Sequence, residues 1–184
     1  MEKIETTRLI LKQSQPYMAD LVLDFYERNK AFLTPFEAKH NEVFYTFSYQ
    51  KKSLLYESTI CAINGSAYRY YIFLKGDETK IIGTISISNI IRSCFQSALI
   101  GYKLDESFIN NGFMTEALEA VIEFAFKELK LHRVEANVMP WNLRSQRVLG
   151  KLKFANEGLA KNFIEINGKW EDHIRFSLVN ENFE

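Results

Sequence analysis

The chain has 184 residues, and its 23 Lys and Arg residues balance 23 Asp and Glu residues, so the formal net charge at pH 7 is zero. This balance argues against a protein that binds nucleic acid by neutralising phosphates, because such domains are usually basic. Apolar residues form 47% of the chain and charged residues 25%. These values are typical of a globular protein, and the length indicates one domain over residues 1–184.

Cysteine usage and hydropathy favour a cytoplasmic location. Only Cys61 and Cys94 occur, with neither the spacing of a metal site nor that of a disulfide framework. The sequence contains no secretory signal and no apolar run long enough to cross a membrane. We therefore expect a cytoplasmic protein with reduced thiols, no metal centre and no membrane partner.

The first third of the chain predicts a short strand followed by two helical regions. The strand is "RLILKQ", and Pro16 suits the first turn of the helix after it. A second, aromatic-rich helical region is expected within residues 42–63, as core or as a dimer contact. Asn64 and Gly65 then give a turn signal.

The middle of the chain predicts consecutive antiparallel strands. They are "YRYYIFLK", "IIGTISISNII" and "SALIGYKL". In the second of these, period-two alternation places Ile81, Gly83, Ile85 and Ile87 on one face.

The last third predicts a long helix, a strand, a short helix and a hairpin. The helix covers residues 114–129, with an i,i+4 pair of Glu123 and Lys127 and a buried stripe of Ala117, Leu118, Val121, Ile122, Ala125, Phe126 and Leu129. "HRVEANVM" alternates as a strand, "NLRSQRVLGKLKF" forms the short helix, and the final hairpin turns at Asn167-Gly168. The whole pattern indicates an α/β domain with a mixed sheet.

The segment "INNGFMTEAL" has the properties of an anion site. Gly112 permits a positive φ angle, and Asn110 and Asn111 tolerate one better than most residues. The N–H groups at the start of the following helix, with its dipole, would suit a phosphate or pyrophosphate. The segment alone also fits a simple turn. Neither of the two common phosphate-loop motifs occurs in the chain.

A second informative segment begins the helix after Pro140. Asn142 and Ser145 stand in its first turn, where such residues commonly cap helices. Arg144, Arg147 and Lys151 follow at i, i+3 and i+7. These cations fit either a solvated face or counter-charges for a ligand phosphate.

These segments together resemble the GNAT superfamily of acetyl-CoA-dependent N-acetyltransferases. The resemblance lies in "NNGFMTEAL", "HRVEANVMPWNLRSQRVLGKLKF", "EGLAKN" and "INGKWEDHI". With "ETTRLIL", "NKAFLTPFE" and "IIGTISISNIIRSCFQSALIGYKL" it covers nearly the whole chain. Within the superfamily the sequence resembles the Rim-type ribosomal-protein alanine N-terminal acetyltransferases. Several segments in matching order are far more specific than the short superfamily signature.

The resemblance implies a single-domain α/β GNAT fold, with a mixed, mostly antiparallel sheet of about seven strands and about four helices. Strands 4 and 5, "ALIGYKL" and "HRVEANVM", would splay apart at a bulge, and the pantetheine arm of acetyl-CoA would pair with strand 4. The residues implied to bind this co-substrate are Tyr102 and Leu104 through their backbone, Ile109, Asn110, Asn111, Gly112, Phe113 and Met114 around the pyrophosphate, and Asn137, Asn142, Ser145 and Arg147.

The loop departs from the superfamily pattern Gln/Arg-x-x-Gly-x-Gly/Ala. Ile109 replaces the Gln/Arg, Asn110 stands where a second glycine is common, and Met114 replaces the small residue. Backbone N–H groups would still bind the pyrophosphate, although losing the Gln/Arg side chain would weaken binding. The carboxylate of Glu116 must point away from the anion.

The implied reaction is direct attack of a neutral amine on the acetyl thioester. An α-amine has a pKa of about 8 and a lysine about 10.4, so the α-amine costs roughly 3 kcal/mol less to deprotonate at neutral pH. A backbone N–H of strand 4 would stabilise the oxyanion. Ser145 matches a family position, and we expect it to hydrogen-bond the leaving thiolate. Glu135 is the expected base, acting through water.

Other side chains are weaker candidates for the chemistry. Glu165 is a second choice for the base, and both glutamates also fit solvated strand positions. His132 and His173 occupy places where structural histidines are common. Cys94 has no neighbour in sequence that would activate it as an acyl carrier.

Three interpretations of the acceptor stay open. The first is a protein N-terminus, including that of a ribosomal protein; the second is a small amine such as a polyamine or an amino sugar; the third is a CoA-binding module without catalysis. The acceptor would lie near Phe36, Glu37 and Tyr70, with Glu37 either attracting a cationic amine or standing as an exposed loop carboxylate. A homodimer also stays open.

Overall fold

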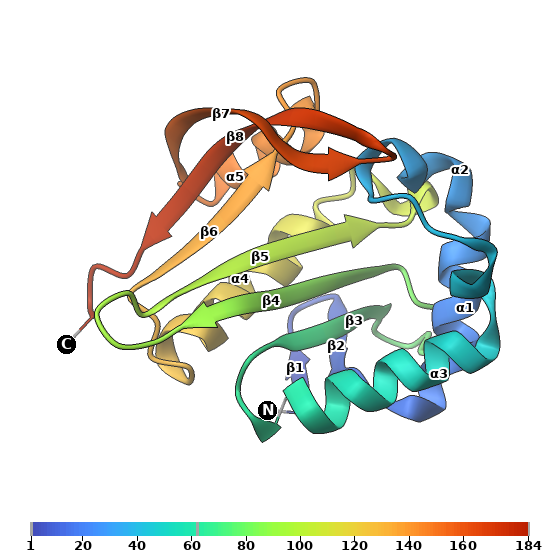
Figure 1. Cartoon of the computed structure of the whole chain (residues 1–184). Coiled ribbons are helices and arrows are strands. Elements are labelled where there is room, and N and C mark those ends of the chain that lie inside the picture. Colours follow the sequence, from blue (N-terminus) through green and yellow to red (C-terminus); the bar gives the residue numbers. More distant parts are fainter. Residues whose placement is uncertain (1, 62, 184) are drawn as a thin grey trace.

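Eight strands form one sheet in the computed structural model, which describes residues 2–61 and 63–183. Their order is β1-β2-β3-β4-β5-β6-β8-β7, and among these pairs only β5 and β6 run parallel (Figure 1). The strands are β1 (Lys3–Glu5), β2 (Leu9–Gln13), β3 (Tyr68–Leu74), β4 (Gly83–Ile91), β5 (Ser97–Leu104), β6 (Arg133–Val138), β7 (Ala155–Ile166) and β8 (Lys169–Val179).

Helices cover both faces of this sheet. The α-helices are α1 (Ala19–Arg28), α2 (Lys30–Leu33), α3 (Phe47–Tyr56), α4 (Phe113–Lys127) and α5 (Leu143–Lys151). Single turns complete the set: η1 (Pro16–Met18), η2 (Thr34–Phe36), η3 (Glu42–Tyr45), the π-helical η4 (Glu57–Cys61) and η5 (Glu106–Phe108). No helix among the described residues is long and apolar enough to cross a membrane.

Alternation along β3 shows how the sheet separates two cores. Tyr70 and Ile72 pack with the apolar stripe of α4, whereas Tyr71 and Phe73 pack with α1 and α3 on the opposite face. The stripe predicted for α4 is confirmed, since all of its members are buried except Phe126, which is half-buried. The sheet is therefore the central layer of three.

The structure adds short elements to those that the sequence predicts. Eight strands are present rather than about seven, because β1 pairs with β2 over only three residues, too few for a period to be visible. α2, also short, raises the number of α-helices to five. The prediction for Ile81 was wrong, because this side chain joins the core under α1 while Ile85 and Ile87 face α4.

The predicted hairpin and the predicted splay are both confirmed. β7 and β8 join at Asn167 and Gly168, which have φ angles of 47° and 83°. β5 and β6 pair only from Ser97 to Leu99 and then separate, as the diverging ribbons in Figure 1 show. Five residues of β5 are thus left without a neighbouring strand on that side.

Candidate active site

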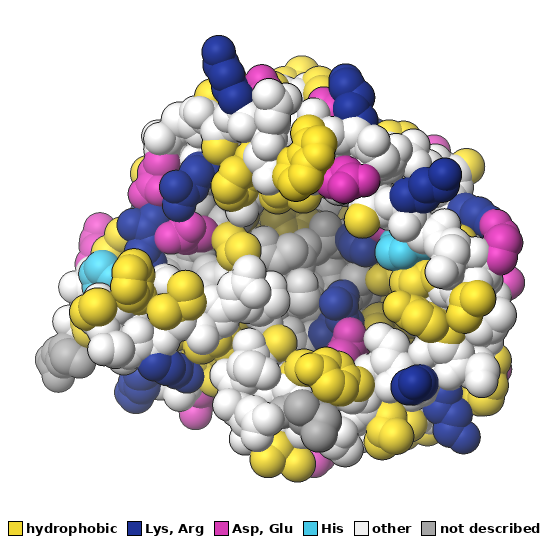
Figure 2. Space-filling model, viewed as in Figure 1, with side chains coloured by type: hydrophobic (Ala, Val, Ile, Leu, Met, Phe, Trp, Pro, Cys, Tyr) yellow, Lys and Arg dark blue, Asp and Glu magenta, His cyan; other side chains and the backbone are white. Residues whose placement is uncertain are grey.

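The gap between β5 and β6 opens into a cavity of about 710 Å³. Figure 2 shows the hollow in this face of the molecule. The unpaired part of β5 and the matching part of β6 line it, together with residues of α2, η2, α4, α5 and β8. The lining residues from β5 and β6 are Ile100, Gly101, Tyr102, Lys103, Leu104, Ala136, Asn137 and Val138.

One wall of the cavity is the loop before α4. Gly112 lies in the left-handed region with a φ angle of 77°, as does Asn110 at 64°. The first N–H groups of α4 have no partner within the helix, and the helix dipole makes this end positive. Residues on this wall are Ile109, Asn110, Gly112, Phe113, Met114 and Thr115. The predicted anion loop therefore faces the cavity.

Arg8 fixes this loop on the side that faces away from the cavity. Its Nη1 donates a hydrogen bond to the carbonyl oxygen of Asn111 at 3.0 Å, and its guanidinium carbon lies 4.5 Å from the ring centre of Phe113. In a trans peptide the C=O and N–H groups point in opposite directions. Fixing the carbonyl of Asn111 therefore turns the N–H of Gly112 away from Arg8. Asn111 itself does not line the cavity as delimited by the described residues.

Glu116 completes this arrangement, and its carboxylate points away from the cavity as expected. It accepts hydrogen bonds from Thr6 Oγ1 at 2.6 Å, from the N–H of Arg8 at 2.8 Å and from Arg8 Nε at 2.7 Å. Partial burial acts to raise the pKa of Glu116, but these hydrogen bonds and the charge of Arg8 outweigh it and lower that pKa. A negative charge at the start of α4 is thus neutralised by its own partner.

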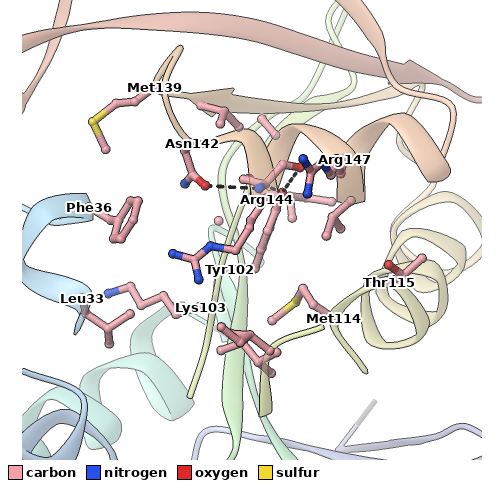
Figure 3. Close-up of a pocket in the computed structure, with 18 of the residues that line it drawn as sticks. Leu33, Phe36, Tyr102, Lys103, Met114, Thr115, Met139, Asn142, Arg144 and Arg147 are labelled. Atoms are coloured by element: carbon pink, nitrogen blue, oxygen red, sulfur yellow. Dashed lines mark hydrogen bonds between the residues drawn. The ribbon is translucent and has the colours of Figure 1, made fainter. Parts of the chain in front are cut away.

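The opposite wall is the start of α5. Asn142 Oδ1 accepts a hydrogen bond from the N–H of Ser145 at 3.2 Å and so caps the helix. Asn142, Ser145 and the three cations Arg144, Arg147 and Lys151 all line the cavity. In Figure 3, Arg144 extends across the cavity toward the side that carries Phe36 and Lys103.

Tyr102 and Ser145 form a pair across the gap. Their hydroxyl oxygens are 2.5 Å apart, and the Tyr102 hydroxyl also lies 3.3 Å from the Ser145 carbonyl oxygen. Burial raises the pKa of Tyr102 to about 12, against a smaller lowering effect of the Ser145 hydrogen bond. The Tyr102 hydroxyl therefore stays protonated at neutral pH and can offer only hydrogen bonds. Its side chain, and not only its backbone, belongs to the site.

The end of the cavity under α2 and η2 is aromatic and carries paired charges. Phe32, Leu33 and Phe36 line it. Glu37 is only 8% exposed and pairs with the ammonium of Lys103 and, at 3.0 Å, with His40 Nε2. The expectation of an exposed carboxylate at Glu37 was wrong, since the chain folds it under η2.

Positively charged side chains outnumber negatively charged ones at this end of the cavity. Burial acts to lower the pKa of Lys103, but Tyr26 and Glu37 outweigh it and raise that pKa, so the ammonium stays charged. Arg144 adds a second cation; the contact found for it within the described residues is with the Phe32 ring, 5.3 Å away. Glu37 supplies one carboxylate, which is already paired.

Some expected residues are not brought to the cavity. Glu135 pairs with Leu99, the last residue of β5 that still contacts β6, and its carboxylate binds Arg133 at 3.0 Å and Arg175 at 3.1 Å. Tyr70 is fully buried in the core with α4. Neither residue belongs to the lining formed by the described residues, nor do Glu165, His132 and Cys94.

Two residues of the site went unrecognised in the sequence, and a third, His173, was expected to be structural. Arg8 lies just before a strand, Lys103 alternates with Tyr102 on β5, and His173 lies inside β8 and lines the cavity. No local pattern marks the roles of Arg8 and Lys103, because their partners Asn111 and Glu37 lie far away in the chain. Among the described residues, no group of His, Cys, Asp and Glu is placed to hold a metal ion.

The fold and this site define an N-acetyltransferase of the GNAT class. The family model described as "Acetyltransferase (GNAT) domain" matches residues 8–155, and the chain belongs to this family. It is 40% identical over 163 residues to "Probable N-acetyltransferase YjcK" of Bacillus subtilis, covering 88% of each chain.

Solved structures of acetyltransferases share this architecture. The ribosomal-protein-S5-alanine acetyltransferase of Vibrio fischeri superposes with a TM-score of 0.93 at 34% identity, covering 99% of this chain and 98% of its own. Mycobacterium smegmatis RimJ in complex with CoA-disulfide gives a TM-score of 0.88 at 27% identity, covering 94% and 82%. The chain is therefore an acetyl-CoA-dependent N-acetyltransferase related to enzymes that modify ribosomal proteins.

Proposed function

We propose that this enzyme transfers the acetyl group of acetyl-CoA to the N-terminal α-amine of a protein, with ribosomal proteins as the candidate acceptors. The observation that carries the proposal is the gap between β5 and β6, whose unpaired backbone, anion loop and α5 cations all face one cavity. An extended pantetheine arm fits an open strand edge, and a pyrophosphate fits the start of a helix.

The loop before α4 and the helix α5 would both contribute to binding acetyl-CoA. The N–H groups from Gly112 to Thr115 would hold the pyrophosphate, with Arg147 and Lys151 as counter-charges from α5. Asn137 lies deeper in the gap, and its side-chain oxygen has no hydrogen-bond partner among the described residues. This oxygen would accept a hydrogen bond from an amide of the pantetheine arm.

Tyr102 and Ser145 would serve the leaving thiolate. If the Tyr102 hydroxyl donates its proton to Ser145 Oγ, the proton of Ser145 is free to bond the sulfur. A serine is a poor acid, so this contact stabilises the thiolate without full proton transfer. The N–H groups of β5 that face the gap would stabilise the oxyanion of the tetrahedral intermediate.

The charges at the far end of the cavity favour a peptide over a polyamine as the acceptor. A polyamine carries only positive groups and would meet Lys103 and Arg144, while Glu37 is already paired. A peptide N-terminus carries one ammonium and a carbonyl a few bonds away, which can accept a hydrogen bond from Arg144. Phe36 and Trp141, with ring centres 5.0 Å apart, would cover the first side chain.

Mass spectrometry of a competition reaction tests this proposal. The enzyme is incubated with acetyl-CoA, purified ribosomal proteins, a polyamine and an aminoglycoside, and acetylated products are identified. We expect acetylation at protein N-termini that depends on the enzyme. Acetylation of the small amines alone would refute the protein acceptor, and CoA release that is independent of any amine would refute the transfer reaction.

A further inference from the structure

The side chain of His173 is held in one tautomer within the cavity. Its Nδ1 lies 3.0 Å from the carbonyl oxygen of Glu171, and a carbonyl can only accept, so Nδ1 carries the proton. In the neutral ring Nε2 then holds a lone pair. Among the described residues, no group forms a hydrogen bond with Nε2. Protein atoms do not fully enclose Nε2, so it is accessible.

The local strand geometry turns His173 inward. The register between β7 and β8 shifts between the pairs Ala160–His173 and Ile164–Glu171, so extra residues of β7 bulge opposite this position. Asp172 accepts a hydrogen bond from the N–H of Asn162 within the bulge at 2.8 Å. Bulges of this kind commonly re-aim a side chain beside an active site. The side chain of His173 is only 3% exposed, yet it lines the cavity.

The hairpin brings His173 to the acceptor end. The turn of the β7–β8 hairpin meets η2, where the N–H of Asn167 donates a hydrogen bond to the carbonyl oxygen of Glu37 at 2.8 Å. Figure 1 shows this tip of the hairpin beside α2. The last residue pair between β6 and β8 is that of Val138 and Ile174. His173 precedes Ile174 in β8, so it lies beside the end of β6, next to the gap.

We infer that His173 is the general base of the acetyl transfer, with Nε2 accepting the proton of the acceptor ammonium. This inference rests on the proposed function. The amine lone pair then forms the C–N bond with the acetyl carbon, and the tetrahedral intermediate collapses with cleavage of the C–S bond. The second proton leaves the nitrogen as the thiolate becomes a thiol, and His173 returns its proton to water.

The charged groups around His173 agree with this role. Lys103 and Arg144 line the same cavity, and neither of these cations can accept a proton from the acceptor. Glu37 is held by Lys103 and His40, and Glu171 pairs with Lys169 at 2.9 Å. Asp172 is engaged with the β7 bulge. None of these carboxylates is free to act in place of His173.

Two acceptors whose nucleophiles differ in ionisation test the inference. One is a short peptide with an N-terminal alanine, and the other carries an aminooxy group in place of the α-amine and is unprotonated at neutral pH. His173→Asn keeps a donor for the Glu171 carbonyl and removes Nε2. We expect kcat/KM to fall about 10²–10⁴-fold for the amine and less than about tenfold for the aminooxy peptide.

Structural damage and a wrong acceptor give different results. Equal losses on both acceptors, or an undiminished rate on the amine, would overturn the role of His173. His173→Gln fills the site more fully and should behave in the same way if His173→Asn is poorly folded. If the wild-type enzyme leaves the peptide unmodified, the proposed acceptor is refuted. The comparison is then made between the amine that the enzyme does accept and the aminooxy analogue of that amine. Acetyl-CoA affinity should stay unchanged in both variants.

Discussion

Replacing Arg8 with alanine should weaken acetyl-CoA binding while leaving the fold intact. The change removes the hydrogen bond that fixes the carbonyl of Asn111 and leaves the carboxylate of Glu116 without its cation. A hydrogen bond to a charged group contributes about 1.5–3 kcal/mol, and the lower end applies because Arg8 is 46% exposed. With the uncompensated carboxylate near the pyrophosphate, we expect a loss of about 2 kcal/mol, or roughly 30-fold in Kd.

Calorimetric titration with acetyl-CoA measures this loss, and kinetics with S-acetylpantetheine show its origin. S-acetylpantetheine lacks the pyrophosphate, so Arg8→Ala should change its kcat/KM by less than about threefold. Lys3→Ala is the matched control, because Lys3 is also 46% exposed and forms an ion pair with Glu5 within β1. It should bind acetyl-CoA normally.

The refuting outcomes are specific. Equal losses of Arg8→Ala on acetyl-CoA and on S-acetylpantetheine would show that Arg8 supports the fold in general and not the anion loop. An unchanged Kd for acetyl-CoA would show that the orientation of the Asn111 peptide has no role in binding. The melting temperature should move little, because exposed ion pairs contribute about 0–1 kcal/mol to stability.

Further predictions concern the thiolate, the backbone and pH. Tyr102→Phe and Ser145→Ala should each lower kcat about tenfold or more with little change in the KM for acetyl-CoA, and equal changes in both constants would contradict a role at the thiolate. Gly83→Ala should cost about 1–3 kcal/mol in chemical denaturation, because its Cβ would stand 2.7 Å from the Lys103 carbonyl oxygen. Gly150→Ala, in open space on α5, should gain up to about 1 kcal/mol. Glu116 has a lowered pKa in the folded state, so its stabilising effect is present above the ordinary glutamate pKa of about 4.3 and is lost as pH falls through the folded value. The stability advantage of the wild type over Glu116→Gln should therefore vanish in acid.

The features that could be predicted are those that depend on residues close together in the sequence. The stripe of α4, the alternation of β6 and the turn at Asn167-Gly168 each depend on a period or a dipeptide, and each is confirmed. The glycine at position 112 marked the loop because only a few residue types tolerate its φ angle. Local physics is sufficient for such features.

The features that could not be predicted join distant residues. Tyr102 and Ser145 are 43 positions apart, and Arg8 and Asn111 are 103 positions apart. Glu135 shows the same limit in another way. It shares the alternation of Asn137, but β5 leaves β6 just beyond Glu135, so only Asn137 reaches the cavity. Periodicity gives the face of a strand and not the point at which its neighbour departs.

The open side of β5 is a sheet edge that faces the cavity and not the outer surface of the molecule. An exposed edge invites pairing with another sheet and hence aggregation. Here residues of α4 and α5 line the cavity beside the open part of β5 and so cover this edge. The same walls that shape the site therefore also protect the protein, and a ligand that pairs with β5 would join the β1–β5 and β6–β8 parts of the sheet, which otherwise share three residue pairs.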